Sequence, residues 1–456
     1  MTGAETAGRP PTETALITPP RSPSMRDPLA RRATATPDRI ARIDPDGTEL
    51  SYTELEDRVA TLAGQLARRG VTADDHLGIL LDGRPVYVSL VHAAIRLGCR
   101  LVPLNPTLDV RALARQVDRA DVGPVVCGAD TVDVAAELGR DRLLVVDAVD
   151  ATDAAEPLST AEPTPVDPPS WRFDDPALLL FTSGTTGNPK AVTLTVGNLV
   201  ASAAASATRL GVLPADRWLS PLPPYHMGGL APIYRSVLYG TAVIVPETTG
   251  PTTLADLAHR HDVTGLSLVP TLLDRLLGTA DGLPASLRFV LLGGGRIPPG
   301  LVDRALSRSV PVHPTSGLTE TASQVATATP SEARDESDTV GRPLVVTTVT
   351  IVDEAGDPVA PGTTGEIVVD GPTVTPGYFG DPTATEAAFG PHGFHTGDRG
   401  SLDASGRLTV VGRRDDRIVT GGENVDPRAV ADVIRSLAGV AEVAVVGLAD
   451  PEWGER

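Results

Sequence analysis

Apolar residues recur at helical spacing in the first regular stretch of the chain. Ser51 and Glu54 stand three residues apart, in the order of a capping box that starts a helix. Apolar side chains then follow every three or four residues, at Leu55, Val59, Leu62 and Leu66. This spacing predicts a helix with one buried face, and Gly70 is suited to end it.

Further along, short apolar runs alternate with helical patterns. The runs lie at 77–81, 85–91, 100–104, 124–127 and 142–147. A helical stretch such as 109–120 separates two of them. This alternation predicts strands joined by helices, and therefore an α/β fold with layers of helices on parallel sheets.

The pattern of apolar and turn-forming residues changes in the C-terminal third of the chain. From 345 to 412, short strand patterns with turn signals predict a small β-rich subdomain. After Arg413, a strand is predicted at 441–448, and it follows a helical stripe made of Val430, Val433, Ile434 and Leu437. One helix and one or two strands are too few to bury a core, so we expect this last unit to be incomplete.

These patterns divide the chain into three predicted parts. Residues 1–26 are rich in Pro, Thr and Ser, which is typical of a flexible leader. Residues 27–412 form the large α/β domain, in which the acidic, proline-rich stretch 148–176 is a loop. Residues 413–456 form the partial α+β unit.

Composition excludes several classes of protein. The net charge of −19 argues against nucleic-acid binding and against binding to anionic membranes. The sequence has no apolar run of the ~20 residues that a membrane helix needs, and the leader lacks the apolar core of a secretory signal. The two cysteines, Cys99 and Cys127, stand in apolar surroundings and are expected to be buried thiols. We therefore expect a cytoplasmic protein.

The single lysine of the chain, Lys190, ends a loop that suits a polyphosphate. A buried strand at 178–181 leads into this loop, which reads Thr182, Ser183, Gly184, Thr185, Thr186, Gly187, Asn188, Pro189 and Lys190. Its glycines allow successive backbone N–H groups to converge, while the hydroxyls add donors and the ammonium adds charge. The loop is not a Walker A motif, because Ala191 stands after Lys190 where that motif has a Ser or Thr hydroxyl. The alternative interpretation is a polar surface loop after a strand.

This segment resembles the signature loop of the adenylate-forming superfamily, which includes acyl-CoA synthetases, luciferases and peptide-synthetase adenylation domains. The resemblance extends from about residue 30 to the end of the chain, and further motifs follow in the family's order. It implies a large N-terminal domain and a small C-terminal lid that rotates between two steps. A carboxylate first attacks the α-phosphate of ATP with Mg²⁺, and CoA then attacks the acyl-adenylate.

The resemblance assigns a catalytic role to Lys190 in the phosphate loop and to residues in two further motifs. In the segment PLPPYHMGG, His226 matches a histidine that borders the acyl pocket, although a lone histidine is more often a packed core residue. In SGLTE, Thr319 matches a phosphate contact and Glu320 matches the Mg²⁺ ligand. The family usually has an aromatic residue stacked on adenine where this chain has Ser316, and serine cannot stack.

The remaining nucleotide contacts also follow from the resemblance. Asp398 matches the aspartate that binds both ribose hydroxyls, since a carboxylate can accept two O–H groups. Arg413 matches a second contact to ribose and phosphate. Glycines near the nucleotide are implied at Gly293, Gly294, Gly295 and Gly317. Asp415 falls at the hinge of the lid, and the loop for the CoA step is implied at Gly421 and Gly422.

The lid of this family normally carries a lysine near its end that contacts the carboxylate and the phosphate during adenylation. The sequence ends before any such residue, and Lys190 belongs to the phosphate loop. We therefore expect either a fragment or a naturally truncated protein, and we expect poor adenylation by the chain as given.

The acid-binding segments look most like those of the o-succinylbenzoate–CoA ligases of menaquinone synthesis. The resemblance is carried by ETASQ, which contains Ser323 and Gln324, and by LPPYHMGGLAPIYRSVLYG. A substrate with two carboxylates favours a cation near the pocket, and Arg235 and Arg296 are the candidates, unless they are solvated or structural. Another aryl or medium-chain acyl-CoA ligase and a non-catalytic nucleotide-binding homologue remain as alternatives, and a homodimer is an open possibility.

Overall fold

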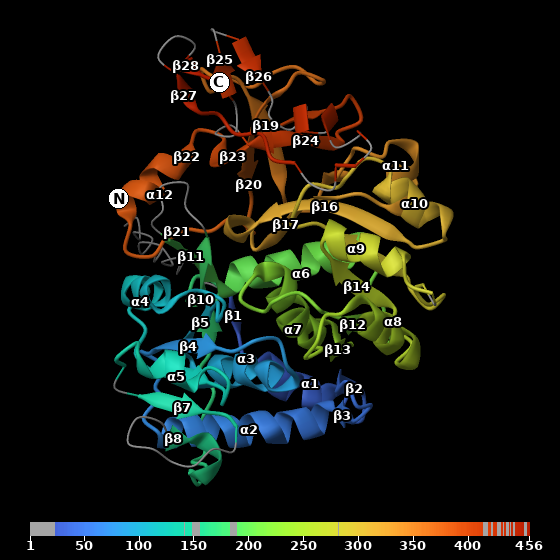
Figure 1. The fold of residues 1–456 in the computed structure, drawn as a ribbon. Helices are drawn as coiled ribbons and strands as arrows, with labels where there is room; N and C mark the ends of the chain where they lie inside the picture. Colours follow the sequence, from blue (N-terminus) through green and yellow to red (C-terminus); the bar gives the residue numbers. More distant parts are fainter. Residues whose placement is uncertain are drawn as a thin grey trace, which may run out of the picture.

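Two large sheets with helices between and around them form the body of the protein, and strands of the C-terminal third cover one end (Figure 1). The computed structural model describes residues 23–140, 142–147, 156–182, 189–280, 282–413, 418–420, 423–425, 430–431, 433–434, 437, 439–440, 443–450 and 454–456.

The first sheet has the strand order β21-β11-β10-β5-β4-β6-β7-β8. Strand β4 pairs in parallel with β5 and β6, as the alternation of apolar runs predicts, while β10 and β11 are antiparallel. The strands are β4 (His76–Leu80), β5 (Arg100–Leu104), β6 (Val125–Cys127), β7 (Leu143–Val145), β8 (Glu156–Pro157), β10 (Pro176–Thr182), β11 (Lys190–Thr195) and β21 (Gly377–Tyr378). The lysine of the phosphate loop therefore begins a strand that returns beside β10.

The second sheet has the order β18-β17-β16-β15-β14-β12-β13-β2-β3. Its central strands β12, β14, β15 and β16 run parallel, so their carboxyl ends meet at one edge. The strands are β2 (Ile40–Ile43), β3 (Glu49–Ser51), β12 (Arg217–Leu219), β13 (Ala242–Ile244), β14 (Gly265–Leu268), β15 (Phe289–Leu292), β16 (Val312–Leu318), β17 (Ser323–Thr327) and β18 (Arg342–Pro343).

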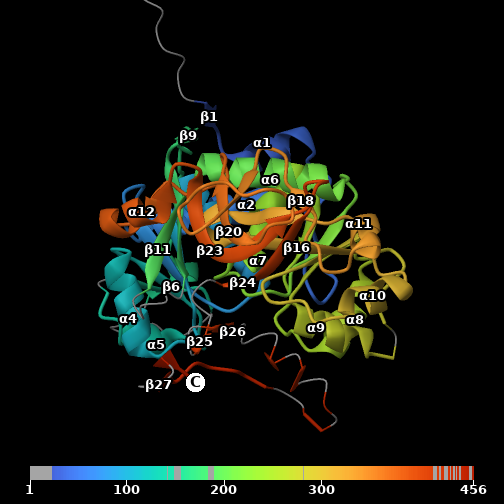
Figure 2. The same ribbon diagram turned by 90° about the horizontal axis from the view of Figure 1, so that it is seen from above.

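Helices fill the space between the two sheets and cover their outer faces (Figures 1 and 2). Apolar residues of α2, α3 and α7 share one core with strands of the first sheet and with Val243 of β13. Helices α4 and α5 pack on the other face of the first sheet, and α8, α9 and α10 on the other face of the second. The described helices are α1 (Pro28–Ala35), α2 (Tyr52–Arg68), α3 (Pro85–Leu97), α4 (Val110–Arg119), α5 (Val132–Ala136), α6 (Val196–Leu210), α7 (Met227–Tyr239), α8 (Pro251–Arg260), α9 (Pro270–Leu277), α10 (Leu301–Ser307), α11 (Pro330–Asp335) and α12 (Pro382–Ala388), with 3-10 turns η1 (Leu158–Thr160) and η2 (Thr319–Thr321).

A third, five-stranded sheet lies in the C-terminal part, within the range predicted to be β-rich. It contains β19 (Thr348–Val352), β20 (Gly365–Asp370), β22 (Phe389–Gly390), β23 (Gly393–Leu402) and β24 (Leu408–Arg413). Small pairings add β1 (Ser24–Met25) with β9 (Trp171–Arg172), and β25 (Ile418–Thr420) with β26 (Glu423–Val425), β27 (Ala449–Asp450) and β28 (Gly454–Glu455). The domain boundaries themselves stay a prediction.

Local sequence signals placed several elements correctly. The capping box of α2 is present, with Ser51 accepting from the backbone N–H of Glu54 and the Glu54 side chain accepting from Ser51. Cys99 and Cys127 are buried free thiols, and burial raises the pKa of each to about 12. Among the described helices, none is long and apolar enough to cross a bilayer.

Two predicted elements were wrong. The apolar run 85–91 is not a strand but the start of α3, whose buried residues lie on all sides because it packs between two sheets. Of the predicted strand at 441–448, residues 441–442 lie outside the described residues and 443–447 form no strand, while Leu448 exchanges two backbone hydrogen bonds with Arg456. In this last unit Val433 is 68% exposed and Leu437 is 59% exposed. Among the described residues of this unit, the exposed apolar stripe offers no buried surface against which a strand at 443–447 can align, which accounts for the second error.

Acid is expected to destabilise the fold through His313 of β16, which is 6% exposed and whose pKa burial lowers to about 4. Between about pH 6.5 and 4 the unfolded chain binds a proton that the folded protein does not, so the free energy of unfolding falls as pH falls. The pKa difference corresponds to on the order of 3 kcal/mol at ~1.4 kcal/mol per unit. Urea unfolding of His313→Gln at both pH values should therefore show a smaller loss than in the wild type.

The matched control for this experiment is His259→Gln, because His259 is an exposed histidine at the end of α8. Equal losses of stability in His313→Gln and wild type would contradict the prediction.

Candidate active site

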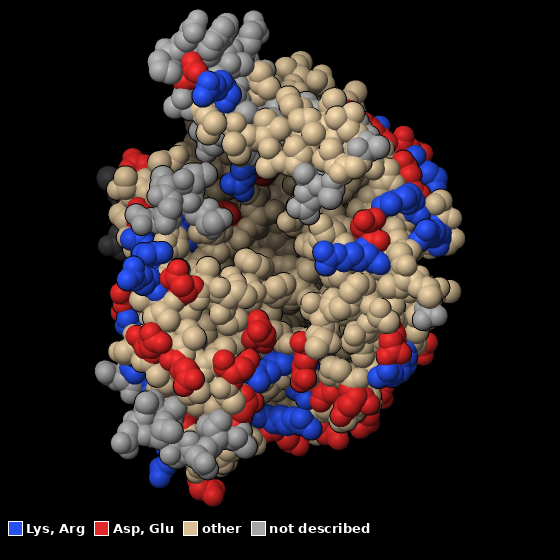
Figure 3. Space-filling model, viewed as in Figure 1, with Lys and Arg blue, Asp and Glu red and all other residues tan. Residues whose placement is uncertain are grey.

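A cleft of about 1470 Å³ opens where the two large sheets meet the five-stranded sheet, at the carboxyl ends of the parallel strands of the second sheet. Figure 3 shows the front of the molecule hollowed at this place. Ligands of open α/β sheets bind at such an edge, because the strand ends and the loops after them are free of covering helices. Of the residues singled out from sequence, the cleft is lined by Thr182, Lys190, His226, Arg235, Gly293, Gly294, Gly317, Thr319, Glu320, Ser323, Gln324, Asp398 and Arg413.

Three candidates are not brought to the cleft. Ser316 does not line it, although its neighbours Thr315 and Gly317 do, and the pairing of β16 with β17 is irregular between Ser316 and Gly317. Gly295 and Arg296 are exposed beyond the carboxyl end of β15 and do not line the cleft. The roles of Arg296 in the acid pocket and of Gly295 in nucleotide binding therefore stay predictions that the geometry of the cleft does not support. The remaining candidates lie outside the described residues: Ser183, Gly184, Thr185, Thr186, Gly187, Asp415, Gly421 and Gly422.

The hairpin of β16 and β17 carries one wall of the cleft in an unusual backbone conformation. A Cβ on Gly317 would lie 1.6 Å from the carbonyl oxygen of Ser323, so only glycine allows the two strands to approach this closely. Ala322 and Ser323 both have positive φ, 50° and 115°. The Ser202 hydroxyl donates to the Ala322 carbonyl at 2.6 Å and holds this turn from helix α6. Strain of this kind at a cleft is typical of a functional position.

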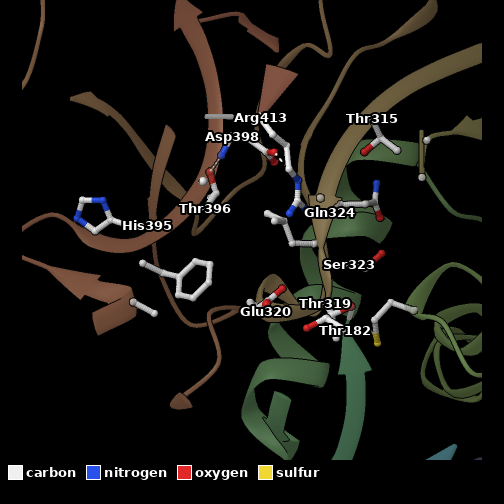
Figure 4. Close-up of a pocket in the computed structure, with 18 of the residues that line it drawn as sticks. Thr182, Thr315, Thr319, Glu320, Ser323, Gln324, His395, Thr396, Asp398 and Arg413 are labelled. Carbon is white, nitrogen blue, oxygen red and sulfur yellow. Dashed lines mark hydrogen bonds and ion pairs between the residues drawn. The ribbon is translucent and has the colours of Figure 1, made fainter. Parts of the chain in front are cut away.

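Glu320, in the turn between these strands, is the central carboxylate of the cleft. Its side chain is 9% exposed, and burial raises its pKa, while the hydrogen bond from Tyr378 and the charges of Arg413 and Lys190 act in the opposite direction. The Tyr378 hydroxyl donates to Oε1 of Glu320 at 3.1 Å. In Figure 4, Thr319 and Glu320 face the cavity from below, and Asp398 and Arg413 face it from above.

Tyr378 is a cleft residue that sequence reasoning missed. The Lys190 ammonium lies 4.8 Å from the centre of its ring. Strand β21, which carries Tyr378, pairs with β11, which starts at Lys190. A two-residue strand is too short to give a periodic pattern of apolar residues. The only signal for Tyr378 in the sequence is an aromatic residue next to a glycine in TPGYFGDP.

Asp398 is held in a tight turn of β23. Its backbone N–H donates to the Thr396 hydroxyl at 3.0 Å, and the N–H of Gly397 donates to Glu366 at 3.2 Å. Its carboxylate Oδ1 lies 3.3 Å from Nε of Arg413 on the neighbouring strand β24. Two residues chosen separately from the sequence therefore form one ion pair at the mouth of the cleft.

Arg235 of α7 reaches the cleft from the interior and is only 1% exposed. It donates to Ser202 at 2.7 Å, to Gln324 at 3.1 Å and to Ser206 at 3.2 Å. Among the described residues its hydrogen-bond partners are all neutral oxygens, and its Nε has none. A buried guanidinium that lacks an anion is expected to bind an anionic group.

His226 precedes α7 and lies on the rim of the cleft, with its ring 4.9 Å from that of Tyr225. Partial burial lowers the pKa of His226, which favours the neutral imidazole at pH 7. A neutral ring can line a pocket for an uncharged part of a substrate without the larger cost of burying a charge.

The carboxylate of Glu320 in the cleft suits a magnesium ion that also binds phosphate oxygens of the nucleotide. No group of three or more His, Cys, Asp or Glu side chains able to hold a metal occurs in the described ranges. Mg²⁺ commonly binds one or two carboxylates together with substrate phosphates and water, rather than a cage of protein ligands. Glu320, with one oxygen bonded to Tyr378, fits that mode.

Comparison with known proteins places these observations in a family. Residues 29–379 match the model of the AMP-binding enzymes. The chain belongs to the AMP-binding enzyme family. In an AMP-binding enzyme, a cleft that combines a lysine, a buried glutamate and an Asp–Arg pair is the place where the nucleotide is expected.

Similar members of the AMP-binding family are known in bacilli. The chain is 38% identical over 429 residues to a 2-succinylbenzoate–CoA ligase of Bacillus velezensis, covering 94% of this chain and 86% of the relative. The 2-succinylbenzoate–CoA ligase of Bacillus subtilis is 36% identical over 427 residues, with 94% and 86% covered. The structure of o-succinylbenzoate CoA synthetase from Bacillus subtilis with its acyl-adenylate intermediate has a TM-score of 0.87 at 34% identity, covering 95% of this chain and 87% of that one. The complex of that enzyme with ATP and magnesium ion has a TM-score of 0.87, also at 34% identity, with 94% and 88% covered.

Proposed function

We propose that this protein is an ATP-dependent o-succinylbenzoate–CoA ligase that works through an acyl-adenylate. The observation that carries the proposal is the buried Arg235 in a cleft of an AMP-binding enzyme. A monocarboxylic acid places its only charge at the reacting phosphate. A dicarboxylic acid has a second carboxylate, and Arg235 with Gln324 offers hydrogen bonds to it at the inner end of the cleft.

In the first step, an oxygen of the substrate carboxylate attacks the α-phosphorus of ATP, and the bond to the bridging oxygen breaks to release pyrophosphate. This in-line displacement requires positioning and charge neutralisation rather than a protein nucleophile. Lys190 and Arg413 both act electrostatically on Glu320 and supply positive charge in the cleft. Asp398 accepts from the ribose hydroxyls and fixes the nucleoside end.

Magnesium, when bound, neutralises charge on the phosphates during this step. Glu320 is the residue that would hold the ion from the protein side. In the second step the sulfur of CoA attacks the acyl carbon, and AMP leaves with the electrons of the mixed anhydride bond.

The direct experiment supplies the purified chain with MgATP, CoA and a panel of acids, and detects acyl-AMP and acyl-CoA by mass spectrometry. The panel contains o-succinylbenzoate, benzoate and medium-chain fatty acids. We expect both products from o-succinylbenzoate. Products from a different acid alone would indicate another acyl-CoA ligase, and ATP binding without any adenylate would indicate a non-catalytic homologue.

Discrimination against 2′-deoxy-ATP tests the role of Asp398. A hydrogen bond to a charged group contributes ~1.5–3 kcal/mol, so we expect kcat/KM for ATP to exceed that for 2′-deoxy-ATP by about 10-fold or more. In Asp398→Asn this ratio should fall towards one. The measurement is pyrophosphate exchange with each nucleotide. Asp370→Asn, an exposed aspartate on the same sheet, is the control and should keep the wild-type ratio. A wild-type ratio in Asp398→Asn would contradict the assignment.

The cytoplasmic location and the homodimer stay predictions. Fractionation of the source cells would test the location, and light scattering of the purified protein would test the oligomeric state.

A further inference from the structure

A short connecting segment, residues 371–379, ties together the two charged groups that face the nucleotide. It leaves the third sheet after β20, passes beside Glu320 and joins the first sheet as β21. It is anchored at its start by Asn198, whose Nδ2 donates to the carbonyls of Pro372 and Val374, both at 2.9 Å.

The segment contacts the backbone of both catalytic elements. The N–H of Thr375 donates to the Glu320 carbonyl at 2.7 Å, and its hydroxyl donates to Thr193 of β11 at 2.5 Å. The N–H of Phe379 donates to the carbonyl of Ala191, the residue after Lys190, at 2.8 Å. Main-chain bonds therefore fix the distance between the strand of Lys190 and the turn of Glu320.

Tyr378 adds side-chain contacts to both charges. Its hydroxyl donates to Oε1 of Glu320, and its ring lies under the Lys190 ammonium. The hydroxyl bond turns the carboxylate in one direction and leaves its other oxygen for a ligand. The ring holds the ammonium by a cation–π contact, without neutralising it as a carboxylate would.

We propose that Tyr378 is a positioning residue for adenylation, which orients Glu320 towards the magnesium-bound phosphates and Lys190 towards the same phosphates. This inference rests on the proposed function. The two parts of the tyrosine have different roles in this proposal: the hydroxyl orients Glu320, the metal-binding carboxylate, and the ring orients Lys190.

The test is a comparison of Tyr378→Phe and Tyr378→Leu by calorimetric titration with ATP, with and without Mg²⁺. In Tyr378→Phe the ring stays under Lys190, so ATP affinity without Mg²⁺ should stay within about 2-fold of wild type. The gain in affinity on adding Mg²⁺ should fall about 10-fold, since one hydrogen bond to a charged group is lost. In Tyr378→Leu the affinity without Mg²⁺ should also fall, by about 3-fold or more.

Activity provides a second readout. The Mg²⁺ concentration for half-maximal pyrophosphate exchange should rise about 10-fold in Tyr378→Phe. Tyr239→Phe is the matched control, because Tyr239 also donates its hydroxyl, to the Ala203 carbonyl at 2.6 Å, but lies outside the cleft. It should keep the wild-type Mg²⁺ dependence.

Two outcomes would overturn the inference. One is a wild-type Mg²⁺ dependence of ATP binding in Tyr378→Phe, and the other is an equal loss of ATP affinity with and without Mg²⁺, which a general loss of structure would cause. If the wild-type chain makes no adenylate from any acid, the proposed function fails, while the binding experiment still reports on Tyr378.

Discussion

Replacing Glu320 with glutamine is expected to slow adenylate formation by ~10²–10³-fold, the usual cost of losing one preorganised electrostatic contact to a transition state. The amide keeps the size of the side chain and can still accept from Tyr378, but it carries no charge for a cation. The same change is expected to stabilise the fold at pH 7.5 by ~0.5–2 kcal/mol. Burial raises the pKa of Glu320, so its ionised form costs stability above that pKa. Pyrophosphate exchange and thermal unfolding measure the two effects.

Glu332→Gln is the matched control for this pair of effects. Glu332 accepts from the backbone of Thr329 and pairs with Arg342, and its pKa is lowered, so its charge contributes stability. Its replacement should reduce the free energy of unfolding and leave activity unchanged, the reverse of the Glu320 result. Adenylation by Glu320→Gln within a few-fold of wild type would exclude Glu320 from the metal site.

Replacing Arg235 with methionine is expected to reduce kcat/KM for o-succinylbenzoate about 100-fold relative to benzoate. A site that binds the second carboxylate of a substrate loses its preference for that substrate when the buried guanidinium is removed, since removing one partner of a buried charge pair costs several kcal/mol. Methionine has a similar length and is tolerated in cores, so it should fill the space of the arginine stem. Ser202 and Gln324 keep their other hydrogen-bond partners, the Ala322 carbonyl and the Thr327 hydroxyl. Competition between the two acids, followed by mass spectrometry of the CoA thioesters, measures the ratio.

Two further variants make the Arg235 result specific. Arg235→Lys keeps the charge but loses the planar fork, so an intermediate ratio is expected. Arg296→Met changes an exposed arginine that does not line the cleft and should have no effect on the ratio. An unchanged ratio in Arg235→Met would mean that the guanidinium only supports the neighbouring hydroxyls and amide.

Elements that are determined by residues close together in the sequence were predicted well. The capping box at Ser51 placed α2, and the apolar runs placed β4, β5, β6 and β7. The run 85–91 failed because a helix buried between two sheets is apolar on several faces, so its periodicity disappears. The strand predicted at 441–448 failed over 443–447, where propensity alone does not supply a partner strand among the described residues.

Motifs likewise placed thirteen of the predicted site residues in the cleft but did not predict its geometry. Gly317, Thr319 and Glu320 lie together because they are adjacent in the sequence. Ser316 does not line the cleft although it is their neighbour, and a strand irregularity between Ser316 and Gly317 of this kind leaves no signal in the motif. Arg235 and Arg296 were equal candidates by composition, and only burial separated them.

The sequence by itself determined the kinds of chemical group that this protein can use. These are one lysine after a hydroxyl-rich loop, a glutamate in a turn and an aspartate in a β-rich region. The tertiary structure decided which of them meet. Glu320 bonds to Tyr378, 58 residues later, and Arg235 bonds to Gln324, 89 residues later. Such contacts depend on strand pairing and on the packing of whole layers, and neither is encoded in the spacing of a local motif.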